Sequence, residues 1–182
     1  MAGFLSNMTS RVVIRLSEEE VMREYDSWIG LTQCESYAMT YLAKHPEEIG
    51  RNRRLGGGWK LAGVEVWLAS SKSKSKKGKR ADLVFTRKGI NGKTDYLVVE
   101  AEDSCTERKL SDGWSQAESY ASLLEGHLRK NRYDHNPVLA AVAAVDWKSA
   151  RGRSTTGWTC GDVWQGDVQD TNTRARRLGK GR

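Results

Sequence analysis

The segment from Val138 to Val145 constrains the fold of this chain more than any other stretch of its sequence. It reads VLAAVAAV between Pro137 and Asp146, an apolar run of eight residues. Such a run is typical of a strand buried on both faces of a sheet. In residues 111–129, which precede this run, apolar residues recur at helical spacing. A helix before the strand favours a crossover connection to a parallel neighbouring strand. Together the two segments predict an α/β fold.

Three shorter segments upstream show the two-residue period of strands. They cover residues 64–68, 81–86 (ADLVFT) and 95–102 (DYLVVEAE). Asn91-Gly92 between the last two favours a tight hairpin turn, so we expect these two strands to pair antiparallel.

The N-terminal part is predicted to be helical. Ser17 with Glu20 and Thr32 with Glu35 fit two capping boxes, and Gly30 lies between them. The pattern therefore allows two helices or one helix kinked at Gly30, ending before His45-Pro46. The predicted order is αβββαβ, with a small mixed sheet flanked by helices.

Positive charge is concentrated in two places. Lys+Arg number 30 against 23 Asp+Glu, a formal net charge of +7. Residues 71–80 (SKSKSKKGKR) carry six positive and no negative charges, and residues 164–182 carry five positive and two negative. Such patches suit a polyanion, because neutralising phosphates releases counterions. A solvated loop and a tail without a partner remain the alternative.

Composition also narrows the class of protein. The apolar run at 138–145 is far shorter than the roughly 20 residues of a membrane helix, and the first twenty residues lack the apolar core of a signal peptide. Three separated cysteines (Cys34, Cys105, Cys160) argue against a zinc site or a disulfide scaffold. We expect an intracellular protein, cytoplasmic or associated with nucleic acid, neither secreted nor membrane-bound. We expect one domain over residues 1–165 and a basic, flexible tail over 166–182.

Acidic residues occupy the two strands around the predicted hairpin. Asp82 begins one strand, and Glu100 and Glu102 end the other on one face, opposite the face of Leu97, Val99 and Ala101. A buried carboxylate is costly unless it is paired or binds a metal. Three such groups brought together by the hairpin are suited to Mg²⁺ or Mn²⁺, which prefer oxygen ligands.

Asp82 and the later Glu100-Ala101-Glu102 on a hydrophobic strand resemble the motif of the PD-(D/E)XK nuclease superfamily. The helix that follows carries Gln116 and Tyr120 in the QxxxY pattern of the RecB-like branch. The resemblance covers roughly residues 30–146. It implies a restriction-endonuclease-like core and a magnesium- or manganese-dependent hydrolase that cleaves DNA, with the choice between endonuclease and exonuclease left open.

The resemblance also implies roles for individual residues. Asp82 and Glu100 would be metal ligands, with the Ala101 carbonyl as a further ligand and Glu102 as ligand or base. Glu35 would be an outer ligand or position water, although its place in a capping box explains it equally well. Gln116 and Tyr120 would support the site or touch the nucleic-acid backbone. The predicted backbone contacts are Lys72, Lys74, Lys76, Lys77, Lys79, Arg80, Arg174, Arg176 and Arg177.

The sequence departs from the motif at one position, because Glu102 stands where the family usually has lysine. The general base is therefore open, with Glu102, Lys88 and Lys109 as candidates. The alternative function is a catalytically inactive nuclease-fold protein that binds nucleic acid. DNA is favoured over RNA as the partner, and a homodimer is one arrangement that would cut both strands.

Overall fold

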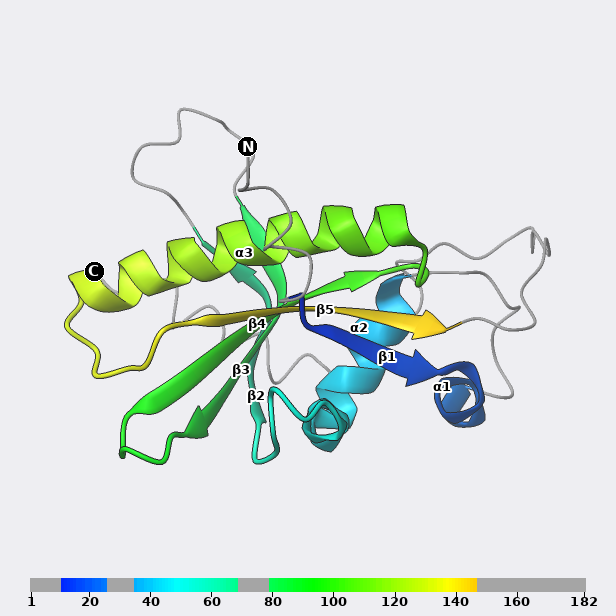
Figure 1. The fold of residues 1–182 in the computed structure, drawn as a ribbon, viewed down its shortest axis with the longest axis horizontal. Coiled ribbons are helices and arrows are strands. Elements are labelled where there is room, and N and C mark those ends of the chain that lie inside the picture. Colours follow the sequence, from blue (N-terminus) through cyan, green and yellow to red (C-terminus); the bar gives the residue numbers. More distant parts are fainter. Residues whose placement is uncertain (1–10, 26–34, 69–78, 147–182) are drawn as a thin grey trace, which may run out of the picture.

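The computed structural model describes residues 11–25, 35–68 and 79–146, which form one sheet with helices on both faces (Figure 1). The strands lie in the order β1-β5-β4-β3-β2. The elements along the chain are β1 (Val13–Ser17), α1 (Glu18–Tyr25), α2 (Glu35–Lys44), the 3₁₀ helix η1 (Pro46–Arg51), β2 (Lys60–Trp67), β3 (Arg80–Lys88), β4 (Thr94–Glu102), α3 (Glu107–Lys130) and β5 (Leu139–Asp146). The fold is thus α/β, with a five-stranded mixed sheet and a long helix packed against it.

The centre of the sheet confirms two predictions from the sequence. Strand β5 runs parallel to β4, with Ala141 opposite Val99, and α3 forms the crossover between the two strands. Strands β3 and β4 pair antiparallel on either side of the Asn91-Gly92 turn. Gly92 has a φ of 82°, which glycine adopts without steric cost.

The predicted order αβββαβ was wrong in one respect, because it lacks β1. This strand pairs parallel with β5 at the sheet edge, with Val13 opposite Val142. Only Ile14 and Leu16 of its five residues are buried, so its two-residue period is too short to stand out in the sequence. Helix α1 begins directly after Ser17, as predicted. Residues 26–34 and the predicted boundary between residues 165 and 166 lie outside the described residues.

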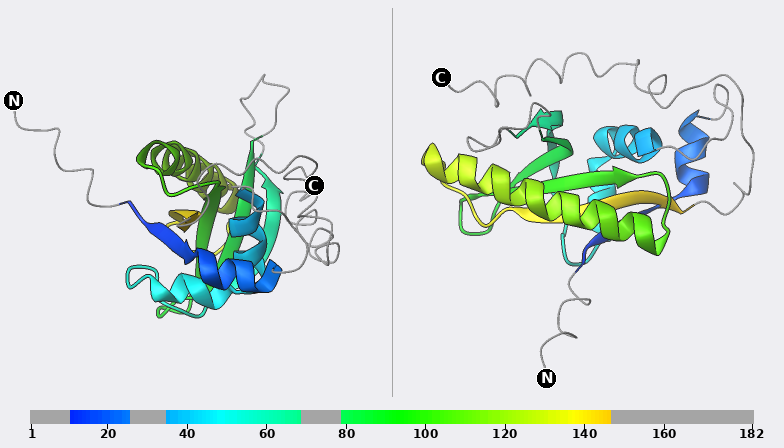
Figure 2. Two further views of the ribbon diagram at one scale, coloured as in Figure 1. Left: turned by 90° about the vertical axis from the view of Figure 1, so that its right-hand side faces the viewer. Right: turned by 90° about the horizontal axis from the view of Figure 1, so that it is seen from above.

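Helices cover the two faces of the sheet unequally (Figure 2). We call the side that packs on α1, α2 and η1 the α2 face, and the opposite side the α3 face. Leu97, Val99 and Ala101 of β4 belong to the cluster on the α2 face, while Val98 belongs to the α3 face. The predicted alternation in β4 is confirmed. No helix in the described part of the chain is long and apolar enough to cross a membrane.

Strand β2 changes faces in the middle. Val64 packs in the cluster on the α2 face, whereas Val66, two residues later, packs on the α3 face. Residues two apart in a regular strand share a face. Glu65 between them has a φ of 48°, in the left-handed region, and this breaks the alternation. The irregularity turns Val66 toward α3 and leaves Trp67 58% exposed.

Candidate functional site

Two carboxylates lie where the β3–β4 ladder ends. The last paired residues are Leu83 and Val99, and the continued register would set Asp82 opposite Glu100. Beyond Leu83 and Val99, side-chain carboxylates accept hydrogen bonds from backbone N–H groups. The Asp82 N–H donates to Glu100 Oε1 at 3.1 Å, and the Ala101 N–H donates to Asp82 Oδ2 at 2.9 Å. Asp82 and Glu100, which we call the acidic pair, thus satisfy backbone donors at the end of the ladder and are held close together.

The acidic pair is largely withdrawn from water. Glu100 is 5% exposed, and Asp82 is half-buried. A carboxylate in such a place is costly unless hydrogen bonds, a cation or a metal stabilise its charge. An apolar residue at position 100 would be the expected choice for stability alone, since Val98 precedes it on the same face.

Helix α3 brings Tyr120 into the electric field of the acidic pair. Burial raises the pKa of Tyr120, and the negative charges of Glu100 and Asp82 raise it further. A phenol is already protonated at neutral pH, and the raised pKa of Tyr120 extends this to more alkaline pH, so its hydroxyl can donate a hydrogen bond. Gln116, one turn earlier in the QxxxY pattern, is exposed to solvent.

Glu102 is directed toward the start of α3, where it meets a lysine. Lys109 Nζ lies 3.7 Å from Glu102 Oε2 and 2.9 Å from Asp103 Oδ2. Gly113 lies so close that a Cβ there would be 2.8 Å from Glu102 Oε1. Lys109 is thus the candidate lysine that lies beside the Glu-Ala-Glu strand, while Lys88 is at the other end of β3.

The acidic pair meets part of what a hard metal ion requires. Among residues 11–25, 35–68 and 79–146, no group of three or more His, Cys, Asp or Glu side chains is arranged to hold a metal. Mg²⁺ commonly uses only one or two carboxylates and keeps several waters. The oxygen donors of Asp82 and Glu100 fit that mode of binding. A ligand role for Glu102 and for the Ala101 carbonyl stays a prediction.

Several predicted site residues lie at or beyond the limits of the described structure. Glu35 opens α2, on the α2 face of the sheet, and its side chain is outside the description. Most residues predicted to contact the nucleic-acid backbone lie outside the described residues. They are Lys72, Lys74, Lys76, Lys77, Arg174, Arg176 and Arg177. The two that are described are exposed. Lys79 Nζ donates to Ser119 Oγ of α3 at 3.3 Å, and Arg80 pairs with Glu65 at 2.9 Å.

A groove on the α3 face was not predicted from the sequence. It has a volume of about 350 Å³ and lies between α3 and strands β2, β3 and β4. Its aromatic lining consists of Trp67, Tyr96, His127 and Tyr133. The signal for Trp67 was weak, because its exposure depends on the left-handed backbone at Glu65.

Comparison with known proteins finds no matching family model, no matching curated protein and no matching solved structure. The resemblance to the nuclease superfamily therefore stays an expectation carried by the residues quoted for it.

Proposed function

We propose that this protein is a metal-dependent nuclease that hydrolyses phosphodiester bonds in DNA at the acidic pair. The observation that carries the proposal is the crossed arrangement of Asp82 and Glu100, each accepting a backbone N–H at the end of the β3–β4 ladder. The arrangement holds two carboxylates close together in a place largely withdrawn from water, where a divalent cation would compensate their charge. A restriction-endonuclease-like core, with β3 and β4 carrying the motif and α3 following it, is part of the same proposal.

The donor set indicates how the site would work. Asp82 and Glu100 would hold Mg²⁺ or Mn²⁺, which activates water and stabilises charge on a transferring phosphoryl group. The Tyr120 hydroxyl, which lies close enough to interact with the charges of Glu100 and Asp82, would donate to a phosphate oxygen. Gln116, exposed on the preceding turn, would contact the nucleic-acid backbone.

The third acidic residue needs a separate role. In this proposal Glu102 accepts a proton from the attacking water, and the Lys109 ammonium 3.7 Å away orients the Glu102 carboxylate. Lys109 also brings a positive charge to the strand whose motif position lacks the usual lysine. Its contact with Asp103 fixes the side chain from a second direction.

A second candidate function is a nuclease-fold protein that binds nucleic acid without cutting it. Two observations favour this alternative: glutamate occupies the usual lysine position, and the described residues bring only two carboxylates into direct register. In both candidate functions the exposed cations Lys79 and Arg80 would contact the nucleic-acid backbone. The first candidate function, the nuclease, also includes an intracellular location with DNA as the partner and a homodimer that cuts both DNA strands.

The decisive experiment is a cleavage assay. Labelled linear, circular and single-stranded DNA would be incubated with the protein and Mg²⁺, Mn²⁺ or EDTA, beside the double variant Asp82→Ala/Glu100→Ala. The matched control is Glu118→Ala, which removes an exposed carboxylate of α3. We expect metal-dependent cleavage by the wild type and the control but not by the double variant. Tight, salt-sensitive binding without cleavage under any metal would select the inactive binder.

A further inference from the structure

The aromatic groove on the α3 face follows the acidic pair along strands β3 and β4. Val84 pairs with Val98 two residues beyond the acidic pair along the two strands, and Thr86 pairs with Tyr96 two residues further on. Val84, Thr86 and Tyr96 line the groove. Two residues along a strand span about 7 Å. The groove therefore begins about 7 Å along the strands from the acidic pair, on the α3 face.

The size and lining of the groove fit a flat ring. A volume of about 350 Å³ lies at the lower end of the range for small-molecule sites, roughly 300–1,000 Å³. Trp67 is 58% exposed and Tyr133 is 54% exposed, so both rings are accessible from solvent. Aromatic side chains stack on the faces of all nucleobases. The Thr86 hydroxyl and the His127 ring add polar groups that can meet the edges of a base.

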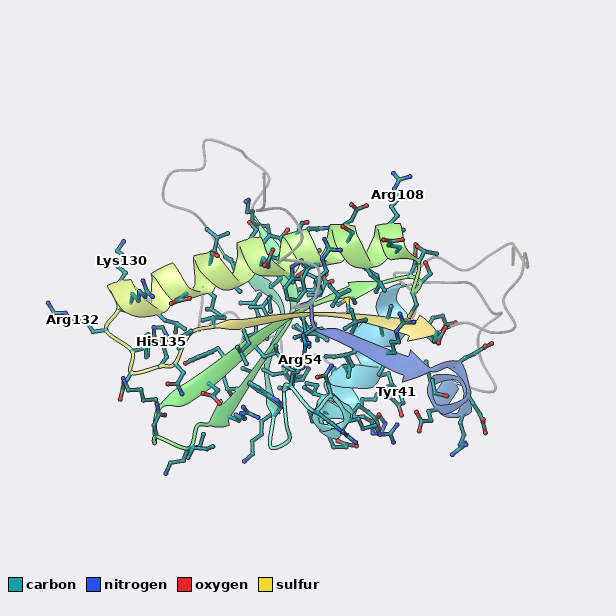
Figure 3. The ribbon with its side chains drawn as sticks, in the orientation of Figure 1. Tyr41, Arg54, Arg108, Lys130, Arg132 and His135 are labelled. Atoms are coloured by element: carbon teal, nitrogen blue, oxygen red, sulfur yellow. The ribbon has the colours of Figure 1, made fainter. Side chains whose placement is uncertain are left out.

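The charges around the groove fit a polyanion. Lys79 and Arg80 adjoin its β3 side, and the Arg80 guanidinium lies 5.9 Å from the centre of the Trp67 ring. Lys130 and Arg132 project outward at the C-terminal end of α3, close in sequence to Tyr133 (Figure 3). Cations at both ends with aromatic rings between them are typical of surfaces that bind single-stranded nucleic acid.

We propose that the groove receives an unpaired nucleobase adjacent to the phosphodiester held at the acidic pair. The inference rests on the proposed function for the position of that phosphate. It narrows the substrate class to single-stranded DNA or DNA with an unpaired nucleotide. A base in an intact duplex must first leave the stack, which costs a few kcal/mol.

The test uses binding rather than cleavage, so that it stands apart from the nuclease activity. The probe is single-stranded DNA about 16 nucleotides long, the upper site size for one small binding domain, with one 2-aminopurine in its sequence. The same strand in a duplex is the comparison, and both are measured with EDTA present. Stacking on an aromatic side chain quenches 2-aminopurine fluorescence, so quenching reports entry of the base into the groove.

The variants are Trp67→Ala, which removes a stacking ring, and Ala62→Phe, which fills the groove. Ile90→Ala, at the exposed tip of the β3–β4 hairpin, is the control. We expect the wild type and the control to bind the single strand with quenching and to bind the duplex more weakly. Trp67→Ala should weaken single-strand binding about 5- to 150-fold, the equivalent of one stacked base. Circular dichroism and Tm of each variant show that it is folded.

Each outcome decides for or against the groove. Equal binding of duplex and single strand, or quenching unchanged in Trp67→Ala, would overturn the proposal whatever the cleavage assay shows. No DNA binding, with a lowered Tm in both groove variants, would mean that the chain or a protein partner fills the groove. Quenching without any metal-dependent cleavage would retain the base site and reject the nuclease.

Discussion

Alternate residues of β4 face two very different environments. Leu97, Val99 and Ala101 are buried in the cluster on the α2 face, while Glu100 and Glu102 are buried on the α3 face. Among the described residues the cluster on the α2 face has 20 buried members and that on the α3 face has eight, so most of the hydrophobic stabilisation comes from the α2 face. Strand β4 thus places apolar side chains on the face that holds the larger cluster and carboxylates on the other face.

The largest predicted effect concerns the charged face. Glu100→Gln removes a negative charge but keeps an oxygen that can accept the Asp82 N–H. We expect DNA cleavage to fall about 1,000-fold, at the upper end of the loss typical for one electrostatic group of an active site. We expect DNA affinity to stay equal or rise, because a negative charge near phosphate is lost. Single-turnover cleavage and a binding titration measure the two quantities.

Stability provides the control for that variant. Because a buried charge is removed, the free energy of unfolding of Glu100→Gln should stay within about 1 kcal/mol of the wild type or increase. A large loss of stability together with retained cleavage would assign Glu100 to the fold and contradict the division between the faces.

The apolar face should respond in the opposite way. Leu97 is fully buried beside Phe85 and Val99 in the cluster on the α2 face. Leu97→Ala should lower the free energy of unfolding by about 3 kcal/mol, through lost burial and the cavity left behind. Denaturant unfolding measures the loss. Cleavage per folded molecule should be unchanged, and a selective loss of cleavage would show that the two faces are coupled.

A carboxylate on the same strand as Glu100 should prove structural. Asp95 is 14% exposed at its side chain and pairs with Arg87 at 2.8 Å. Burial alone would raise the pKa of Asp95, but hydrogen bonds from Asn136 and Arg87 and the charge of Arg87 lower it overall. Asp95→Asn should cost about 2 kcal/mol at neutral pH, without loss of cleavage by the folded fraction.

The pH dependence follows from that lowered pKa. The stability contributed by Asp95 is fully present above its unfolded pKa of roughly 3.9 and is lost as pH falls through the lower folded value. The difference in Tm between wild type and Asp95→Asn should therefore shrink below about pH 4. A difference that stays constant down to acid pH would show that the ion pair is not its source.

The smallest effect tests the contact between Glu102 and α3. Gly113 costs the helix about 1 kcal/mol relative to alanine, yet a Cβ at this position would lie 2.8 Å from Glu102 Oε1. Gly113→Ala should therefore displace Glu102 and lower turnover. The gain in helix propensity and the close approach of the Cβ to Val142 Cγ1, 3.2 Å away, oppose each other, so stability should change by no more than about 1 kcal/mol. Gly126→Ala, an exposed helix glycine with open space around it, is the matched control and should be slightly stabilising. Wild-type turnover in Gly113→Ala would remove Glu102 from the mechanism.

The parts of the fold with strong periodicity could be predicted from the sequence. The run from Val138 to Val145, the helix before it and the Asn91-Gly92 hairpin gave the centre of the sheet, because each pattern is long or has specific turn chemistry. Strand β1 could not be predicted, since its stability comes from pairing with β5, which is remote in sequence. The change of face in β2 depends on one left-handed residue, Glu65, that no sequence period reveals.

The candidate site was predictable to a similar extent. Alternation in β4 and the hairpin were enough to expect Asp82 near Glu100, but the hydrogen bonds between them depend on where the ladder stops. The direction of Glu102 toward Lys109 is set by the close approach of α3 at Gly113, a tertiary feature. The groove was missed for the same reason, because residues from three strands and a helix form it.

The central claim is that the acidic pair is a metal site, and Mn²⁺ binding tests it most directly. Calorimetric or electron paramagnetic resonance titration of the metal-free protein with Mn²⁺ would compare wild type, Glu100→Gln and the control Glu118→Gln. The account predicts stoichiometric binding by the wild type and the control, and its loss in Glu100→Gln. Binding by Glu100→Gln equal to that of the wild type would contradict the account.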